Sequence, residues 1–465
     1  RWHPMTILSL FDAVALTRPD SVALVSSHGS CTYGELRRRS DAVARALLAA
    51  GVGREVPVGI SVARSVESVV AVLGVLRAGG AYVPIDPEYP AERQQWMAEK
   101  AAVGALLVDS RRTSQPGWTP AALPVIDISG PPQNEREPPL LAPDVAEAEL
   151  LNILFTSGST GRPKGVCGTH GAMLNRLRWG WEMFPFAPGD VLAHRSSLNF
   201  VDAGPELFSA LLRGVPTAIV LPEEQADLAR FVAVLVRHRV TRITVVPSIL
   251  SAIVRNVPDL DETLSALRLW VTSGEELTLS ALTAFRAAHP SATLVNLYGT
   301  TEVTGDVTCA VFRPGSALPT DRVPIGRAMA GAELFILDDD GRNVPEGETG
   351  QLHVGGPVLA RGYHLSPQEE TLRFSRHPTR PDERVFWTGD LVRRGPDGTV
   401  DYLGRADNLV KIRGVRVELE EIERCLRGAC PDVLDIAAVA LDTDRLVAAV
   451  TPLGADLKAL DSAAT

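Results

Sequence analysis

The spacing of hydrophobic residues alternates between two periods along the first part of the chain. Residues 40–51 (SDAVARALLAAG) and 66–80 (VESVVAVLGVLRAGG) have helical spacing, whereas residues 56–62 (VPVGISV) and 81–85 (AYVPI) are short apolar runs typical of strands. Helices that alternate with apolar strands are typical of βαβ units, whose strands lie parallel in one sheet. The sequence therefore predicts an α/β body.

The same alternation continues toward the C terminus, with two interruptions. Residues 115–143 are rich in proline and polar residues, which predicts irregular surface chain. After Leu403 a helix-spaced segment, 417–426, precedes strand signals at 433–441 and 446–450, so we expect a small C-terminal subdomain. The other predicted elements are a strand at 150–155 and two helix–strand pairs, at 228–238 with 240–246 and at 279–288 with 293–297.

Composition limits the kinds of partner. The chain has 465 residues, a formal net charge of −10 and no block of Lys or Arg, which argues against nucleic-acid binding. No uncharged apolar run approaches the roughly 20 residues of a membrane helix. The five cysteines lack CxxC and zinc-site spacing, so we expect a cytoplasmic protein with reduced thiols and no membrane partner. Arg1 opens the chain without an initiator Met or a signal-peptide pattern, which favours a fragment or a processed chain.

The predicted strand at 150–155 runs directly into TSGSTGRPKG, residues 156–165, with three glycines, four hydroxyl residues and one lysine. Glycines let backbone N–H groups approach a phosphate, hydroxyls donate hydrogen bonds, and Lys164 supplies positive charge. The segment is not a Walker loop, because Pro163 and Gly165 replace the glycine and the Ser/Thr that flank the lysine there. A flexible surface turn remains the alternative on composition alone.

TSGSTGRPKG resembles the phosphate-binding loop of the adenylate-forming superfamily, and further motifs of that family follow in order. Within the superfamily, AYVPID and NLVKIRG resemble the adenylation domains of nonribosomal peptide synthetases more than fatty-acyl-CoA ligases. The resemblance implies an enzyme that joins an acid to AMP from ATP with Mg²⁺, releasing pyrophosphate. The other matching motifs are CTYGEL (31–36), LRAGGAYVPID (76–86), NLYGTTE (296–302), FWTGD (386–390) and GRADNLVKIRGVRVE (404–418).

The resemblance also implies roles for single residues. Glu302 matches the Mg²⁺ ligand, Tyr298 the aromatic residue that stacks on adenine, and Asp390 the carboxylate that accepts both ribose hydroxyls. Lys164, Thr301, Glu302 and Arg405 match the catalytic set. The residues implied to bind the nucleotide are Thr156, Ser157, Gly158, Ser159, Thr160, Gly161, Lys164, Gly274, Glu275, Asn296, Leu297, Tyr298, Gly299, Thr300, Thr301, Asp390 and Arg405.

The family resemblance implies two parts, an adenylation core at residues 1–404 and a small mobile α+β lid at 405–465, with a hinge at Asp407. The lid would swing to admit the phosphopantetheine thiol of a carrier protein, with Lys411 and Gly414 on the second surface, and dependence on a small activating partner protein is left open. The sequence stops at Thr465 before the family's lid motif with its catalytic lysine, and Lys458 does not match that motif. We therefore expect a lid that was cut or is shown incomplete.

The acid-binding residues follow from the same resemblance. Members that activate α-amino acids have Phe-Asp where this chain has Phe200 and Val201, and the acidic anchor is displaced by one residue, to Asp202. The resulting pattern resembles that of members that select β-alanine. A β-amino group lies one methylene farther from the carboxylate, so its counter-ion, Asp202 or Asp306, must move as well. The predicted pocket comprises Phe200, Val201, Asp202, Pro205, Val245, Val271, Ser273, Leu297, Gly305 and Asp306.

Several alternatives remain at this stage. Asp202 could instead cap the helix that begins near Pro205, and Asp306 could lie in a surface loop. A larger β-amino acid such as β-lysine would fit the same charges. An aryl-acid or acyl-CoA ligase would leave two carboxylates without a cation, and a nucleotide-binding module without catalysis is supported only by the missing lysine motif. Aminoacyl-tRNA synthetases are set aside because HIGH and KMSKS signatures and a basic face are absent from the sequence.

Overall fold

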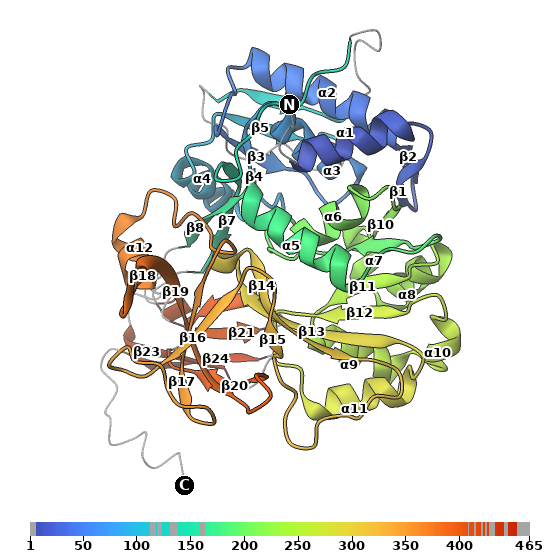
Figure 1. Cartoon of the computed structure of the whole chain (residues 1–465). Helices are drawn as coiled ribbons and strands as arrows, with labels where there is room; N and C mark the ends of the chain where they lie inside the picture. Colours follow the sequence, from blue (N-terminus) through green and yellow to red (C-terminus); the bar gives the residue numbers. More distant parts are fainter. Residues whose placement is uncertain are drawn as a thin grey trace.

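The architecture comes from a computed structural model of the whole chain (Figure 1). The residues it describes are 6–111, 118, 123–130, 138–157, 163–407, 409–412, 415–419, 422–423, 426, 433–440 and 445–452. Figure 1 shows three parts, each built around a sheet: an upper layer at the top, a middle layer below it on the right, and a third part below it on the left, here called the lower layer. The fold class predicted from the sequence, an α/β body of mixed sheets with flanking helices plus a small C-terminal subdomain, is confirmed.

The helices and strands have the following bounds. The helices are α1 Ile7–Thr17, α2 Tyr33–Ala49, α3 Val66–Arg77, α4 Ala91–Lys100, α5 His170–Met183, α6 Ala203–Leu211, α7 Pro222–Gln225, α8 Leu228–Arg237, α9 Pro247–Asn256, α10 Leu260–Thr263, α11 Leu279–Ala288, the 3₁₀ turn η1 Thr301–Val303 and α12 Pro367–Arg373. The strands are β1 Val22–Ser26, β2 Gly29–Thr32, β3 Pro57–Ser61, β4 Ala81–Pro84, β5 Ala105–Val108, β6 Val125–Asp127, β7 Leu150–Thr156, β8 Lys164–Thr169, β9 Leu192–His194, β10 Thr217–Ile219, β11 Arg242–Val245, β12 Leu269–Thr272, β13 Thr293–Thr300, β14 Gly305–Phe312, β15 Arg327–Ala328, β16 Glu333–Leu337, β17 Thr349–Gly355, β18 Phe374–His377, β19 Arg380–Arg394, β20 Val400–Arg405, β21 Leu409–Ile412, β22 Val415–Glu418, β23 Val433–Ala440 and β24 Leu446–Pro452.

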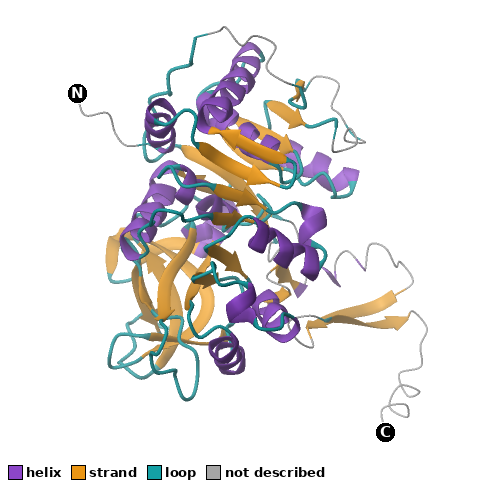
Figure 2. Cartoon of the chain, turned by 90° about the vertical axis from the view of Figure 1, so that its right-hand side faces the viewer, coloured by secondary structure: helices purple, strands orange, loops and turns teal. Residues whose placement is uncertain are grey.

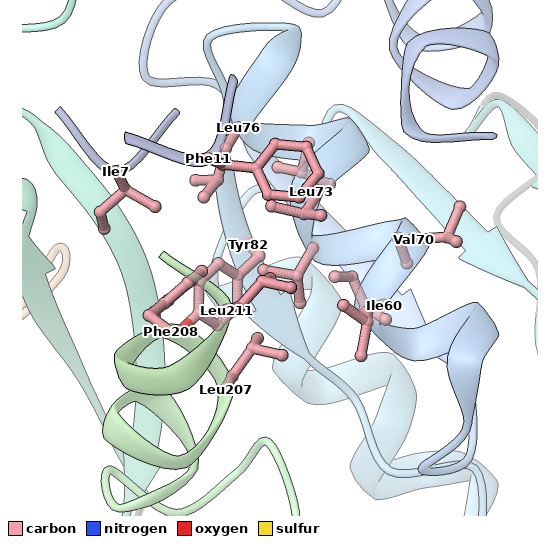
Figure 3. Packing of buried hydrophobic residues seen from close by; sticks show 14 of the residues in the cluster. Ile7, Phe11, Ile60, Val70, Leu73, Leu76, Tyr82, Leu207, Phe208 and Leu211 are labelled. Atoms are coloured by element: carbon pink, nitrogen blue, oxygen red, sulfur yellow. The ribbon is translucent and has the colours of Figure 1, made fainter. Parts of the chain in front are cut away.

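The upper layer contains the predicted βαβ units. Its described strands run in the order β6-β5-β3-β4-β7-β8, and β3 pairs in parallel with both β4 and β5. Helix α3 is buried along almost its whole length, which explains its nearly continuous apolar sequence. Figure 3 shows side chains of α1, α3, β4 and α6 gathered in the core of this layer, so the first two layers share one hydrophobic core.

The middle layer is a second mixed sheet, with the described strands in the order β15-β14-β13-β12-β11-β9-β10-β1-β2. Strands β9, β11, β12 and β13 run parallel, so their carboxyl ends lie along one edge. Ligands in open α/β sheets bind at this kind of edge. Strand β13 then turns through η1 into the antiparallel β14, which returns along it.

The lower layer holds β16, β17, β19, β18 and β20, joined by antiparallel pairings. Strand β20 pairs with β19 as far as Arg405, which lies opposite Asp390. Two hairpins follow, β21 with β22 and β23 with β24. Figure 2 shows the second hairpin at the periphery of the molecule, next to the C terminus.

Three predicted elements differ from the structure. Helix α2 begins at Tyr33 rather than near Ser40, because the Thr32 side chain accepts a hydrogen bond from Glu35 N at 3.2 Å and caps an earlier turn. The segment 115–143 was predicted to be irregular, yet it contributes β6, which pairs in parallel with β5. Val417 belongs to β22, whereas much of the predicted helix over 417–426 lies outside the described residues.

The other predicted helices and strands occur within a few residues of their expected bounds. Within the described part of the chain, no helix combines the length and the apolar character needed to span a membrane.

Candidate active site

Three neighbouring cavities open where the strands of the upper and middle layers end. The Tyr298 cavity, about 350 Å³, is lined by Asn296 to Gly299, Asp390, Tyr402, Arg405 and Lys411. The Thr301 cavity, about 520 Å³, is lined by Thr156, Ser157, Phe200 to Asp202, Thr300, Thr301, Gly305 and Lys411. The Arg195 cavity, about 480 Å³, is lined by Arg64, Arg195 to Phe200, Asp202 and Val245. Gly274 lines all three cavities, so they form one continuous site.

Asp390 is the centre of polar contacts in the Tyr298 cavity. Its Oδ2 accepts a hydrogen bond from the Tyr298 hydroxyl, and its Oδ1 accepts one from Arg405 Nη1 at 2.7 Å. Burial, followed by the nearby Asp390 charge, raises the pKa of Tyr298 above its usual value, so this phenol stays protonated and donates. A buried carboxylate beside an aromatic ring is an arrangement that suits a ribose and its base.

The predicted base-binding residues line the same cavity. Asn296 is buried, and its Nδ2 donates to the Pro324 carbonyl oxygen at 2.9 Å, which fixes the orientation of the amide. Leu297, Gly299 and Glu275 also line this cavity. The Glu275 carboxylate, however, accepts from the backbone N of Ser248 at 2.8 Å and so supports the start of α9. Its side chain therefore has a structural partner in addition to its place in the cavity wall.

The predicted phosphate-binding residues are only partly described. Thr156 and Ser157 line the Thr301 cavity, whereas Gly158, Ser159, Thr160 and Gly161 lie outside the described residues, as does Gly414. Lys164 opens β8 and is 2% exposed, with its Nζ 5.4 Å from the centre of the Tyr363 ring. The loop lysine is therefore held by the protein interior rather than by an exposed turn.

Glu302, the predicted metal ligand, lies on η1 in the same region. Its side chain is fully buried, and its Oε1 accepts a hydrogen bond from the Tyr363 hydroxyl at 2.9 Å. A carboxylate oxygen is the donor type that Mg²⁺ prefers, and Mg²⁺ usually needs only one or two protein carboxylates in addition to substrate phosphates. The donor chemistry of Glu302 thus fits Mg²⁺, and Thr300 and Thr301 beside it reach the cavity.

The predicted acid pocket comes together in part. Phe200, Val201, Asp202, Ser273 and Gly305 all line the Thr301 cavity. Gly305 lies beside Val201, since a Cβ added to Gly305 would come within 3.6 Å of a Val201 methyl. Of the other predicted pocket residues, Val245 lines the Arg195 cavity, Leu297 the Tyr298 cavity, Pro205 lies in α6, and Val271 packs in the hydrophobic cluster of Trp179.

Asp306 is buried beside the pocket rather than exposed in a surface loop. It is 4% exposed, and Gly299 on the paired strand permits the close approach, because a Cβ there would lie 1.6 Å from the Gly305 carbonyl oxygen. Ser273 Oγ donates to Asp306 Oδ1 at 3.2 Å. Arg176 Nε donates to Asp306 Oδ2 at 2.9 Å, so the expectation that this carboxylate would need a cation from the substrate is wrong.

Asp202 immediately precedes α6 but does not cap it. Its backbone is helical, and it makes no side-chain capping hydrogen bond. The carboxylate borders both the Thr301 and the Arg195 cavities. Burial, followed by the negative charges of Asp306 and Glu206, raises the pKa of Asp202 to about 7. A carboxyl group that is costly to ionise and borders a cavity is suited to a cationic ligand.

Glu206 was not predicted from the sequence, yet it shapes the turn that carries Phe200 to Asp202. This buried carboxylate accepts hydrogen bonds from the backbone N–H groups of Arg195 and Ser196, both at 2.8 Å, and from the Ser196 hydroxyl at 2.8 Å. The His194 ring nitrogen Nδ1 lies 3.2 Å away. These contacts fix the end of β9, so Glu206 positions the acid pocket without lining it. In the sequence, Glu206 is the one charged residue in the apolar helix segment PELFSALL, and this position was the available sign that its carboxylate has a buried partner.

Asp407, the predicted hinge residue, follows directly after β20. Its carboxylate accepts from Arg405 Nε at 2.8 Å and from Arg373 Nη2 at 2.9 Å. Burial opposes ionisation, but the charges of Arg405 and Arg373 keep the pKa of Asp407 below its usual value. The segment after the core is thus tied back to the core by an ion pair.

Comparison with known proteins agrees with this geometry. Residues 11–364 match the family described as AMP-binding enzyme. The chain belongs to this family. It is 38% identical over 450 residues to phosphinothricin tripeptide synthetase PhsB of Streptomyces viridochromogenes, an alignment that covers 96% of this chain and 37% of that protein. It is 34% identical over 448 residues to zwittermicin A synthase ZmaJ of Bacillus cereus, covering 95% of this chain and 84% of that one.

Solved structures lead to the same family. Holo-PA1221, described as an NRPS protein containing adenylation and PCP domains, superposes with a TM-score of 0.85 at 27% identity, covering 98% of this chain and 78% of that one. The chain is thus an adenylation domain of the nonribosomal peptide synthetase type, an ATP-dependent adenylate-forming ligase. It spans just over a third of the length of the phosphinothricin synthetase, 37%.

Proposed function

We propose that this domain activates a β-amino acid, β-alanine above all, as its acyl-adenylate, and then passes it as a thioester to a carrier protein. The observation that carries the substrate assignment is the position of the acidic residue in the pocket. Val201 stands where α-amino-acid-activating members have the anchor, and Asp202 borders the cavity one residue later without capping α6. Because Asp306 is paired with Arg176, Asp202 is the carboxylate left to receive the ammonium.

In the first half-reaction, the nucleotide occupies the Tyr298 cavity with its ribose hydroxyls at Asp390. A carboxylate oxygen of the amino acid attacks the α-phosphorus of ATP, the bond to the bridging oxygen of the β-phosphate breaks, and pyrophosphate leaves. Thr300, Thr301 and Arg405 line the Thr301 cavity, from which they would donate to the reacting phosphate, and preorganised donors of this kind stabilise the developing charge. Mg²⁺, when bound, would offset the charge of the departing pyrophosphate, and Glu302 would hold it.

In the second half-reaction, the phosphopantetheine thiolate of a carrier protein attacks the acyl carbonyl and AMP leaves. PA1221 contains an adenylation domain together with a PCP domain, which supports this kind of partner. The C-terminal residues Leu409, Lys411, Val417 and Leu446 also line the Thr301 cavity, so we place the approach of the thiol next to them. A small activating partner protein stays a prediction from the family resemblance.

The test is ATP–pyrophosphate exchange with a panel of β-alanine, alanine, propionate, β-lysine and an aryl acid. We expect β-alanine to give the highest kcat/KM. Propionate should fail by the widest margin, because sites built around a polar substrate group reject analogues that lack it by as much as ~10⁴–10⁵. Alanine should be activated weakly, since its ammonium lies beside Val201, which offers no acceptor. Faster exchange with alanine or with the aryl acid would contradict the β-amino assignment and leave the adenylation activity intact.

A further inference from the structure

Arg176 lies behind the acid pocket on α5 and contacts two residues, Asp306 and Trp179. Its Nε and Nη2 atoms are both 2.9 Å from Asp306 Oδ2, and its guanidinium carbon lies 4.9 Å from the centre of the Trp179 ring. The side chain of Arg176 is 12% exposed and that of Asp306 is 2% exposed. The two side chains therefore form a nearly buried ion pair. Asp306 also accepts a hydrogen bond from the hydroxyl of Ser273, which directly follows β12.

The pair determines how many uncompensated charges the pocket presents. Three carboxylates face the region, those of Asp202, Asp306 and Glu206. Glu206 is occupied by the β9 turn, and Asp306 is occupied by Arg176. The Asp202 carboxylate makes no hydrogen bond and no ion pair within 4.0 Å with another described residue, although the more distant positive charges of Arg176 and Lys411 act on it. Since an unpaired buried charge costs several kcal/mol, the pocket is matched to a ligand that brings one cation.

We propose that Arg176 is a specificity-determining residue: by neutralising Asp306 it limits the acid site to one free carboxylate and selects an amino acid with one ammonium over a diamino acid. This inference rests on the proposed function, because it takes Asp202 as the ammonium acceptor. Arg176 lines none of the three cavities described above. It acts through Asp306, whose neighbour Gly305 lies beside Val201 in the pocket wall.

The physical consequence of removing Arg176 is specific. Arg176→Met would leave Asp306 buried beside an apolar side chain and without its cation, next to newly opened space. A substrate with a second ammonium could then supply the missing charge. A substrate with one ammonium could satisfy only one of the two carboxylates, so its binding would weaken. Specificity is the difference between the affinities for two substrates. Arg176→Met should raise the affinity for the substrate with two ammonium groups and lower the affinity for the substrate with one.

The experiment measures ATP–pyrophosphate exchange with β-alanine and with 2,3-diaminopropionate for the wild type and four variants. We expect Arg176→Met to shift the ratio of the two kcat/KM values toward 2,3-diaminopropionate by about tenfold or more, as for residues coupled in one ion-pair network. The double variant R176M/D306N should restore the wild-type ratio, because it removes both charges together. Arg176→Lys should largely preserve the ratio. Arg178→Met is the matched control, since Arg178 lies on the same helix with a side chain 41% exposed and approaches Glu147 only to 3.9 Å.

AMP affinity and the melting temperature of each variant separate a specificity role from a structural one. A lower melting temperature with an unchanged substrate ratio in R176M would overturn the proposal, as would a double variant no closer to the wild type than the single one. If R176M does not fold, Asp306→Asn tests the same ion pair by removing its negative charge instead of its positive charge. It leaves Arg176 positive and unpaired, so the preference for β-alanine over propionate should fall, and an unchanged preference would overturn the proposal. A wild type that ignores β-alanine would instead contradict the proposed function.

Discussion

At the scale of single residues, Asp390 has the clearest assignment. It is buried, opposite Arg405 on the paired strand and within hydrogen-bonding distance of Tyr298. Asp390→Ala should weaken AMP binding by roughly 1–3 kcal/mol or more, the cost of losing a buried charged acceptor. Isothermal titration with AMP measures this loss. Asp397→Ala, at an exposed turn, is the control, and an unchanged AMP affinity in D390A would remove the ribose assignment.

Asp202 leads to a prediction about pH. Its pKa is raised to about 7, so the carboxyl group is mostly protonated below that pH and mostly ionised above it. If the ionised form binds the ammonium of β-alanine, the KM should rise about tenfold per pH unit below pH 7 and level off above it. Asp202→Asn should raise the KM and abolish this pH dependence. A KM profile that is the same in the wild type and in D202N would exclude Asp202 as the ammonium acceptor.

The sequence predicted the roles of single residues only where those residues belong to a motif. Tyr298, Asp390 and Arg405 belong to short contiguous motifs, and the structure brings them together around one cavity. Arg176 and Glu206 lie on α5 and α6 without such a motif, and their roles depend on partners far away in the chain. Arg176 meets Asp306 only because β14 folds back along β13 beside α5. Partners of this kind follow from tertiary structure and could not be read from local sequence.

At the scale of elements, the turn between β9 and α6 controls the acid pocket. The Glu206 carboxylate accepts hydrogen bonds there from two backbone N–H groups and one hydroxyl. Burial alone would raise the pKa of Glu206, but the contact with His194 and the charge of Arg195 outweigh burial and keep this pKa below its usual value. Glu206→Gln would keep the shape but lose one charged acceptor. We expect a loss of about 1–3 kcal/mol in the free energy of unfolding, together with a higher KM for the amino acid and a nearly unchanged affinity for AMP.

Chemical denaturation and exchange kinetics measure the two effects of that substitution. The exposed Glu223→Gln on the short helix α7 is the control. Equal losses in amino-acid and AMP binding would show that E206Q disturbs the fold generally rather than the turn.

Sequence periodicity predicted the elements better than their ends. Helix α11 has the predicted bounds, because its apolar spacing and its cap at Thr278 coincide. Helix α2 begins earlier than predicted, since Thr32 provides a cap before the apolar periodicity begins. Strand β6 has only three residues, none of them buried, so its apolar signal is too short to be distinguished from a loop. Its strand state depends on pairing with β5.

At the scale of the whole molecule, the site lies where all three layers meet. The upper layer contributes Thr156 and Ser157, the middle layer Asp202 and Thr301, and the lower layer Asp390 and Arg405. The sequence predicted these residues in chain order. The order of strands within each sheet was not predictable, because parallel neighbours such as β4 and β7 are far apart in the chain. The shared site therefore depends on the packing of the layers as much as on its motifs.

The connection to the C-terminal hairpins supplies the last prediction. Asp407 is held by Arg373 from the core, and beyond it Lys411 lines both the Tyr298 and the Thr301 cavities. By family resemblance, Lys411 belongs to the surface used in thioester formation. Asp407→Ala removes the charge-assisted contact that holds the segment in this arrangement, a contact worth about 1.5–3 kcal/mol. It also removes the Asp407 partner of Arg405, whereas the Asp390–Arg405 pair stays in place.

The rate of thioester formation with a carrier protein should therefore fall about tenfold or more relative to pyrophosphate exchange, while AMP affinity changes little. Loading of a holo carrier protein, measured beside exchange, gives this ratio, with Asp401→Ala at the half-exposed pair with Arg393 as the control. An equal fall in both rates would mean that Asp407 supports the nucleotide site itself. An unchanged ratio would mean that the ion pair to Arg373 does not govern the position of the hairpins, and that the contacts of Lys411 with the cavities form independently of it.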